Sequence, residues 1–70
     1  MLSLCTAPVD TRQTIKWCFL DDPEHMFTEA LGLVQGAEVK VLDSCWGGVV
    51  VSVGGTRVAL GREIAERIKV

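Results

Sequence analysis

Residues Leu31 to Leu42 read LGLVQGAEVKVL and contain the change of hydrophobic period around which the chain folds. Before this stretch apolar residues recur at helical spacing, whereas from Ala37 onward apolar and charged residues alternate, which is typical of a strand with one buried face. Gly32 and Gly36 separate the two patterns. We expect Gly32 to end a helix in a left-handed conformation and Gly36 to shape the turn into the strand.

The same two glycines have other readings, which the flanking sequence disfavours. A GxxxG pair that dimerises membrane helices needs a long apolar helix, and the segment before Gly32 is short and polar. A phosphate loop needs the pattern GxxxxGK[ST] between a strand and a helix, and no such pattern follows Gly36. The glycines therefore indicate the ends of structural elements.

Upstream, the stretch TRQTIKWCFL predicts a first strand over Thr11 to Leu20. Its alternation places Ile15, Trp17 and Phe19 on one face, and we expect that face, Trp17 included, to lie in the core.

The residues after this strand predict a short amphipathic helix from Pro23 to Leu31. Asp22 is suited to cap the helix, and Pro23 to occupy its first position, where the missing N–H costs nothing.

Downstream, the runs AEVKVL, VVVSV and TRVAL predict three strands joined by the turns SCWGG and GG. The tail GREIAERIKV predicts a helical turn with an Arg62–Glu66 pair. The predicted fold class is mainly β with short helices, a small antiparallel barrel with one helix inserted after the first strand. We expect one domain over residues 10–70 and a loosely held segment over residues 1–9.

Composition excludes several classes of protein. The 70 residues carry nine acidic and seven basic side chains and no basic block, so nucleic acid is not expected as a partner. No apolar run approaches the ~20 residues of a membrane span, and the start lacks a secretory signal, so a cytoplasmic protein is expected. Cys5, Cys18 and Cys45 form no CxxC pair, and we expect free thiols, with Cys18 acting as a small hydrophobic residue.

The order of a helix, LGLVQG, an alternating strand, GGTRVAL and REIAERIKV resembles the FeoA family, from about Thr14 to Val70. The chain differs from many members in its tight SCWGG connection and in Gly61, where arginine is common in the family. The resemblance implies an SH3-like barrel and a cytosolic accessory protein of bacterial ferrous iron uptake. It also implies contact with the cytoplasmic GTPase portion of the FeoB transporter, without catalysis.

The alternative is a stand-alone sensor of Fe²⁺ or Mn²⁺, or an oligomerisation module, resembling the C-terminal domain of iron-dependent repressors. Weak metal candidates are His25 and Glu29, which share a face of the predicted helix and whose side chains suit Fe²⁺. Two ligands do not close a metal site, and acidic residues at a helix start are equally explained by the helix dipole. No resident cofactor is expected, and a single histidine with no nucleophile placed beside it argues against an enzyme.

Four residues are predicted to bind a partner. Leu33 and Val34 lie between the two glycines outside any period; we expect Leu33 to fill one end of the barrel and Val34 to form an exposed apolar contact. Trp46, expected to be half exposed in its turn, and Arg57 are of types enriched in protein interfaces and are expected to extend the same patch. Self-association remains an open alternative.

Overall fold

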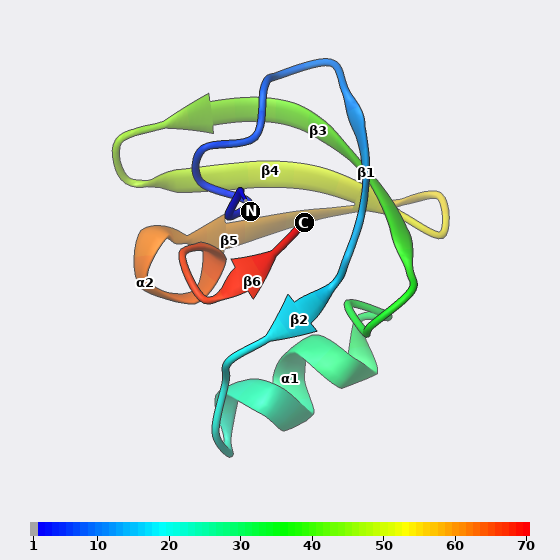
Figure 1. Ribbon diagram of the computed structural model, residues 1–70, viewed down its shortest axis with the longest axis vertical. Helices are drawn as coiled ribbons and strands as arrows, with labels where there is room; N and C mark the ends of the chain where they lie inside the picture. The colour runs from blue at the N-terminus through cyan, green and yellow to red at the C-terminus, as the bar shows by residue number, and fades with distance from the viewer. Residues whose placement is uncertain (1) are drawn as a thin grey trace.

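The chain alternates short strands with two short helices over residues 2–70, the part that the computed structural model describes (Figure 1). In chain order the elements are β1 (Arg12–Thr14), β2 (Trp17–Cys18), α1 (Glu24–Ala30), β3 (Glu38–Cys45), β4 (Gly48–Val53), β5 (Thr56–Gly61), α2 (Arg62–Ala65) and β6 (Ile68–Lys69).

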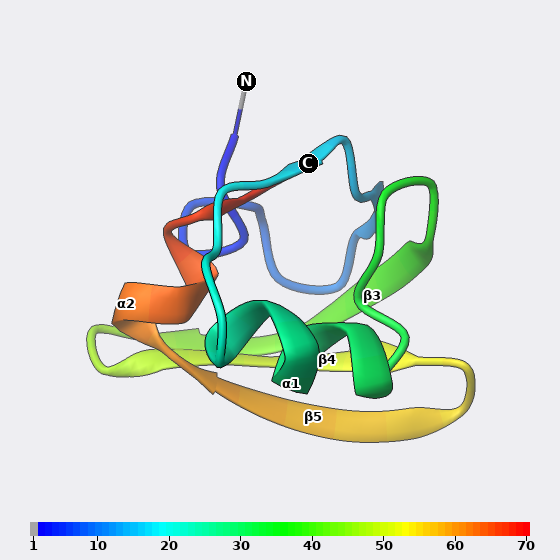
Figure 2. The ribbon, with the colours of Figure 1, turned by 90° about the horizontal axis from the view of Figure 1, so that it is seen from below.

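The strands form two antiparallel sheets. One has the order β1-β3-β4-β5, and β2 pairs with β6 in the other. Figure 2 shows β3, β4 and β5 on one side of the molecule and both chain ends on the other, with α1 beside the sheet. The predicted mainly β fold with a helix between the first strand and the meander is confirmed.

Apolar side chains from both sheets and from the connections fill the space between them. The buried core consists of Leu4, Ala7, Ile15, Leu20, Leu33, Val39, Val41, Val49, Val51, Val53, Val58, Leu60, Ala65, Ile68 and Val70.

The end of α1 is a Schellman motif. Gly32 has a φ of 85°, and its amide donates to the carbonyl oxygen of Glu29 at 3.0 Å. The amide of Leu33 donates to the carbonyl oxygen of Thr28 at 2.9 Å. This turn directs Leu33 into the core, where its side chain is 1% exposed. The predictions that Gly32 ends the helix and that Leu33 fills the core are both confirmed.

The start of α1 differs from the prediction. The helix begins at Glu24, Pro23 is its boundary residue, and no side chain caps it by a hydrogen bond. The expected Asp22 cap is therefore wrong, because the helix starts one residue later than predicted and Asp22 lies outside the capping position. Its carboxylate oxygen Oδ1 lies 3.8 Å from Nδ1 of His25 instead.

The predicted first strand is split between the two sheets, and this corrects the assignment of Trp17 and Phe19 to the core. The amide of Ile15 donates to the carbonyl oxygen of Ala37, whereas the amide of Lys16 donates to that of Lys69. Lys16 and Trp17 are both exposed and Cys18 is half-buried, so the alternation of buried and exposed positions shifts by one residue after Ile15. Ile15 is buried, but Trp17 is 48% and Phe19 61% exposed.

The prediction for the N-terminal segment is also wrong. We expected residues 1–9 to be loosely held, yet Leu4 is fully buried and Ala7 nearly so. Ser3 forms an isolated antiparallel β-bridge with Lys69, and the amide of Leu4 donates to the carbonyl oxygen of Ile68 at 2.9 Å. The segment is therefore part of the folded unit, because it pairs with β6 at the far end of the sequence; Met1 lies outside the described residues.

The turn between β3 and β4 depends on a glycine. A side chain at Gly48 would collide with the backbone carbonyl oxygen of Leu60 on the paired strand, whereas a side chain at Gly47 meets nothing within 4 Å. Close approach of the two strands therefore requires glycine at position 48 but not at position 47.

We predict that Gly48→Ala lowers the free energy of unfolding by about 1–3 kcal/mol, because β4 and β5 must separate to admit the methyl group. The matched variant Gly47→Ala should stay within about 0.5 kcal/mol of the parent. Urea denaturation followed by circular dichroism measures both. Equal stabilities for the two variants would contradict the close approach at Gly48.

Candidate functional site

The four predicted partner-binding residues do not form one surface. Val34 precedes β3 and Trp46 follows it, so all eight residues of that strand lie between them, which is roughly 25 Å of extended chain. Arg57 pairs with Ser52 near the β4–β5 turn, at the opposite end of β4 from Gly48. The two turns lie at opposite ends of the sheet in Figure 1. Trp46 therefore cannot extend a patch that contains Val34 and Arg57, because the length of the sheet separates them.

The Val34 loop is held at both ends by backbone hydrogen bonds. Gly36, with a φ of 89°, donates its amide to the carbonyl oxygen of Ile15 at 2.7 Å, and the amide of Ala37 donates to that of Val34 at 3.0 Å. Leu33 points into the core from this loop, while Val34 is 41% exposed. The loop thus presents Val34 to solvent on a fixed backbone, and the buried side chain of Leu33 anchors the loop to the core.

Trp46 projects from the β3–β4 turn and is 81% exposed, more than the half exposure we expected. The guanidinium carbon of Arg62 lies 5.1 Å from the centroid of the indole ring, and Nη1 of Arg62 donates to the carbonyl oxygen of Trp46 at 3.3 Å. Nε of Arg62 also pairs with Oε1 of Glu66 at 2.9 Å, as predicted for this pair. Arg62 therefore holds the exposed ring in place by a cation–π contact and a hydrogen bond.

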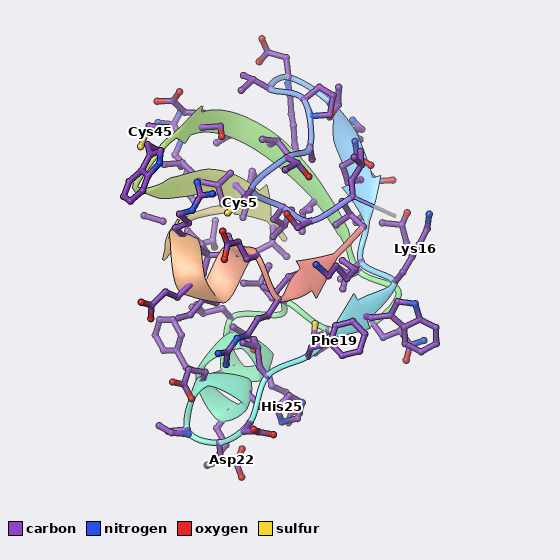
Figure 3. All side chains as sticks on the ribbon, turned by 60° about the vertical axis from the view of Figure 1, so that its left-hand side comes forward. Cys5, Lys16, Phe19, Asp22, His25 and Cys45 are labelled. Carbon is purple, nitrogen blue, oxygen red and sulfur yellow. The ribbon has the colours of Figure 1, made fainter. Side chains whose placement is uncertain are left out.

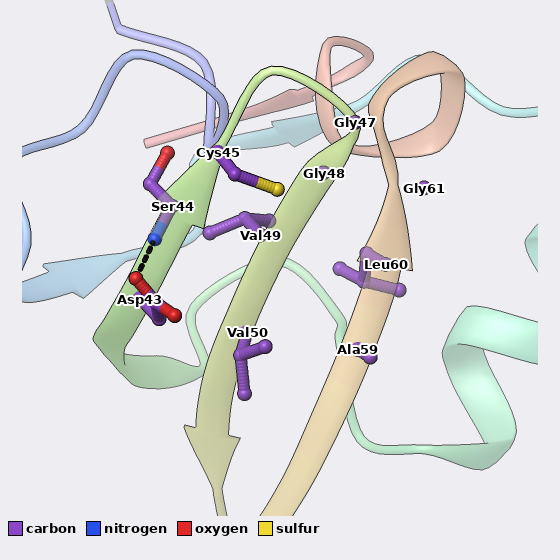
Figure 4. Close-up of a pocket in the computed structure, with 10 residues that line it drawn as sticks. All are labelled: Asp43, Ser44, Cys45, Gly47, Gly48, Val49, Val50, Ala59, Leu60 and Gly61. Atoms are coloured by element: carbon purple, nitrogen blue, oxygen red, sulfur yellow. Dashed lines mark hydrogen bonds between the residues drawn. The ribbon is translucent and has the colours of Figure 1, made fainter.

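Two hollows lie near this turn, and both are lined by Gly47 and Gly61. One, of about 310 Å³, extends over β3, β4 and β5 between Asp43 and Ala59 (Figure 4). The other, of about 400 Å³, lies between Trp46 and Ile64. The two glycines leave space that larger residues would fill, and Trp46 itself lines the second hollow. We call the exposed ring, Arg62 and the two glycines the Trp46 corner.

The weak metal candidates lie close together but at the surface. Nε2 of His25 is 3.7 Å from Oε2 of Glu29 on the same helix. The side chains of His25, Glu29 and neighbouring Asp22 are all exposed. Among residues 2–70, no group of three or more histidine, cysteine or carboxylate side chains is arranged to hold a metal ion. The observed arrangement is a group of solvated side chains at the start of a helix, where acidic residues favour the helix dipole.

All three cysteines are free thiols, but their surroundings differ. Cys18 packs against the core, and its Sγ donates to the carbonyl oxygen of Leu33 at 3.7 Å. Burial raises the pKa of the Cys18 thiol. Burial also raises the pKa of Cys5, and the negative charge of Glu66 adds to that effect. Cys45, the last residue of β3, is exposed.

Two exposed aromatic residues, Trp17 and Phe19, were missed as surface residues by sequence reasoning, because they share the apparent strand phase of buried Ile15. No local signal could have identified them, because Lys16 between Ile15 and Trp17 fits the same alternation. Over residues 2–70, the helices are too short to cross a membrane.

Comparison with protein families gives a match to the model of the FeoA domain over residues 2–70. No match was found among curated proteins.

Solved structures show the same fold. The chain is similar to the crystal structure of an iron uptake regulatory protein, FeoA, with 26% identity and a TM-score of 0.87, over 96% of this chain and 91% of that chain. It is similar to Stenotrophomonas maltophilia FeoA, an SH3 domain protein complexed with zinc, with 27% identity and a TM-score of 0.75, over 99% of this chain and 88% of that chain. The predicted SH3-like class is thus confirmed.

A manganese-dependent transcriptional repressor is also similar, with 18% identity and a TM-score of 0.84, over 96% of this chain and 39% of that chain. At this identity the likeness shows the fold alone.

We predict that iodoacetamide at about pH 8 modifies Cys45 first and Cys18 at least about tenfold more slowly, because a buried thiol with a raised pKa holds less thiolate at a given pH. Mass spectrometry of timed digests measures the order. In urea the three rates should converge. Modification of Cys18 as fast as Cys45 in the folded protein would contradict its packing against the core.

Proposed function

The chain belongs to the FeoA family, and from this premise we propose that it is a cytosolic accessory protein of bacterial ferrous iron uptake that contacts the cytoplasmic GTPase portion of a FeoB-type transporter. Membership implies involvement in ferrous iron transport. The family consists of small transport-associated domains and is not a known enzyme family. The proposal adds the partner and the mode of action, which is protein contact without catalysis.

The observation that carries the proposal is the Trp46 corner. A tryptophan that is 81% exposed in a free chain is a large apolar surface left in water. Tryptophan and arginine dominate the energetic centres of protein interfaces, and these centres lie beside pockets that the partner fills. Here Arg62 already holds the ring, and the two hollows lie near its turn. Little conformational entropy would be lost on binding, which favours affinity.

The Val34 loop is the second candidate contact. It presents one apolar side chain from a backbone that is fixed at Gly32 and Gly36, and exposed Arg57 lies toward the same end of the sheet. Because Leu33 is buried, it supports this contact from the core and does not touch the partner. The two candidate contacts are far enough apart to be tested separately.

A metal-responsive sensor is the competing function. The likeness to the manganese-dependent repressor shows the fold alone, and zinc belongs to the Stenotrophomonas maltophilia structure. The side chains of His25, Asp22 and Glu29 in this chain are exposed, with contacts of 3.7 and 3.8 Å. Protein contact is therefore the better-supported function.

We predict that Trp46→Ala weakens binding to the isolated cytosolic GTPase domain of the transporter by about 2 kcal/mol or more, roughly 30-fold in Kd. Isothermal titration calorimetry measures this change. Trp17→Ala, which removes another exposed indole from a different face, is the matched control and should bind like the parent. If the parent does not bind the domain, the proposed function is wrong.

The same titration locates the contact. Val34→Asp should remain folded and weaken binding by about 1–3 kcal/mol if the loop lies in the interface. Leu33→Asp should unfold the chain, because a carboxylate cannot be buried there without a partner. If Val34→Asp abolishes binding while Trp46→Ala binds like the parent, the contact lies at the loop and not at the Trp46 corner.

A further inference from the structure

The outer face of the β2–β6 ribbon carries two exposed aromatic rings. Trp17 and Phe19 are two positions apart, so they project from the same side of the extended chain, and they are 48% and 61% exposed. The opposite side of the ribbon is apolar and packed, with Cys18 paired to buried Ile68. The ribbon therefore has a core side and an aromatic outer side.

Basic residues surround these rings. Lys69 lies opposite Trp17 in the antiparallel register, and the amide of Phe19 donates to the carbonyl oxygen of Arg67, which places Arg67 beside Phe19. Lys16 is the residue before Trp17 and is exposed. Three of the seven basic residues of a chain with a net charge of −2 thus lie on one two-stranded ribbon.

These three cations are not neutralised by ion pairs. Within residues 2–70, the ion pairs of basic side chains use Arg12, His25 and Arg62. The Nζ of Lys69 donates to the carbonyl oxygen of Glu66 at 2.7 Å, while the Glu66 carboxylate pairs with Arg62. The charges on the ribbon are therefore available to an external anion.

Three acidic residues adjoin the ribbon at its Phe19–Arg67 end: Glu66 directly precedes Arg67, and Asp21 and Asp22 come soon after Phe19. Asp21 and Asp22 follow β2, and Figure 3 shows Lys16 and Asp22 at opposite ends of this segment, with Phe19 between them. An anionic surface would therefore meet the Lys16 end first and would be repelled from the Asp22 end. The arrangement defines an orientation for docking.

We propose that this face, the ribbon face of Trp17, Phe19, Lys16, Arg67 and Lys69, docks reversibly on the surface of a lipid bilayer that contains anionic headgroups. Aromatic rings favour the boundary between headgroups and acyl chains, and long basic side chains reach the headgroups while their apolar stems stay near the rings. Juxtaposed cations are attracted by the negative potential of an anionic leaflet.

The shape of the ribbon face favours a bilayer over a protein as the surface that it contacts. The two hollows described above, which suit the side chains of a protein partner, are lined by no residue of the ribbon face. A short two-stranded ribbon with two projecting rings needs no pocket to insert them between lipids. Docking through this face leaves the Trp46 corner free, because the two surfaces share no residue.

The proposal goes beyond contact with a transporter, and its test requires no transporter. The folded chain is mixed with vesicles of phosphatidylcholine alone or of phosphatidylcholine and phosphatidylglycerol in equal parts, and flotation measures the bound fraction. At low salt, binding to the anionic vesicles should exceed binding to the neutral vesicles by at least about tenfold and should fall as salt is added. Failure to bind anionic vesicles, or equal binding to both, would overturn the proposal.

Matched variants locate the contact. The double variant Trp17→Ser with Phe19→Ser should lower the partition coefficient for anionic vesicles at least about tenfold, whereas Trp46→Ser should leave it unchanged. Circular dichroism checks that each variant is folded. A loss in Trp46→Ser with none in the double variant would overturn the assignment to the ribbon face.

Tryptophan fluorescence gives a second readout that does not depend on flotation. In Trp46→Phe the emission reports Trp17 alone and should shift to the blue with anionic vesicles, while in Trp17→Phe the emission of Trp46 should not shift. Polyglutamate, a soluble polyanion, serves as the competing ligand. Binding of polyglutamate without binding of vesicles would identify the ribbon face as a site for an acidic protein and would refute docking on lipid.

Discussion

The hydrogen bond from the amide of Leu33 to the carbonyl oxygen of Thr28 is the interaction on which the arrangement of this domain depends. It forms only because Gly32 adopts a left-handed conformation, and it ends α1 while directing Leu33 into the core. Gly36 then ties the loop to Ile15 before β3 begins. The connection between α1 and β3, residues 31–37, thus closes the core, sets the start of the main sheet and exposes one apolar side chain.

The core and the candidate contact surfaces are built from adjacent residues with opposite exposure. Leu33 is buried and Val34 exposed, and in the β3–β4 turn Gly48 allows close strand pairing while Trp46 projects into solvent. This division explains how so short a chain can keep a packed core and still present large apolar side chains. The side chains that face solvent are held by backbone geometry or, at Trp46, by Arg62.

Much of the fold could be predicted from sequence, because β3, β4 and β5 alternate regularly and glycines mark their turns. Buried Leu33 and its glycine cap were predicted on the same basis. The exposure of Trp17 and Phe19 and the burial of Leu4 were not, because both depend on pairing with β6, some fifty or more positions along the chain. Sequence reasoning also named Val34, Arg57 and Trp46 as one patch, because periodicity does not report that β3 separates them.

The central claim is that this chain acts by presenting a preorganised apolar corner to a protein partner. The most direct test is to follow backbone amide shifts of the labelled chain during addition of the transporter's cytosolic GTPase domain. The account predicts shifts centred on the turn at Trp46 and on the start of α2, and none around His25. Shifts confined to the His25 and Glu29 side of α1, or no shifts at saturating partner, would contradict it.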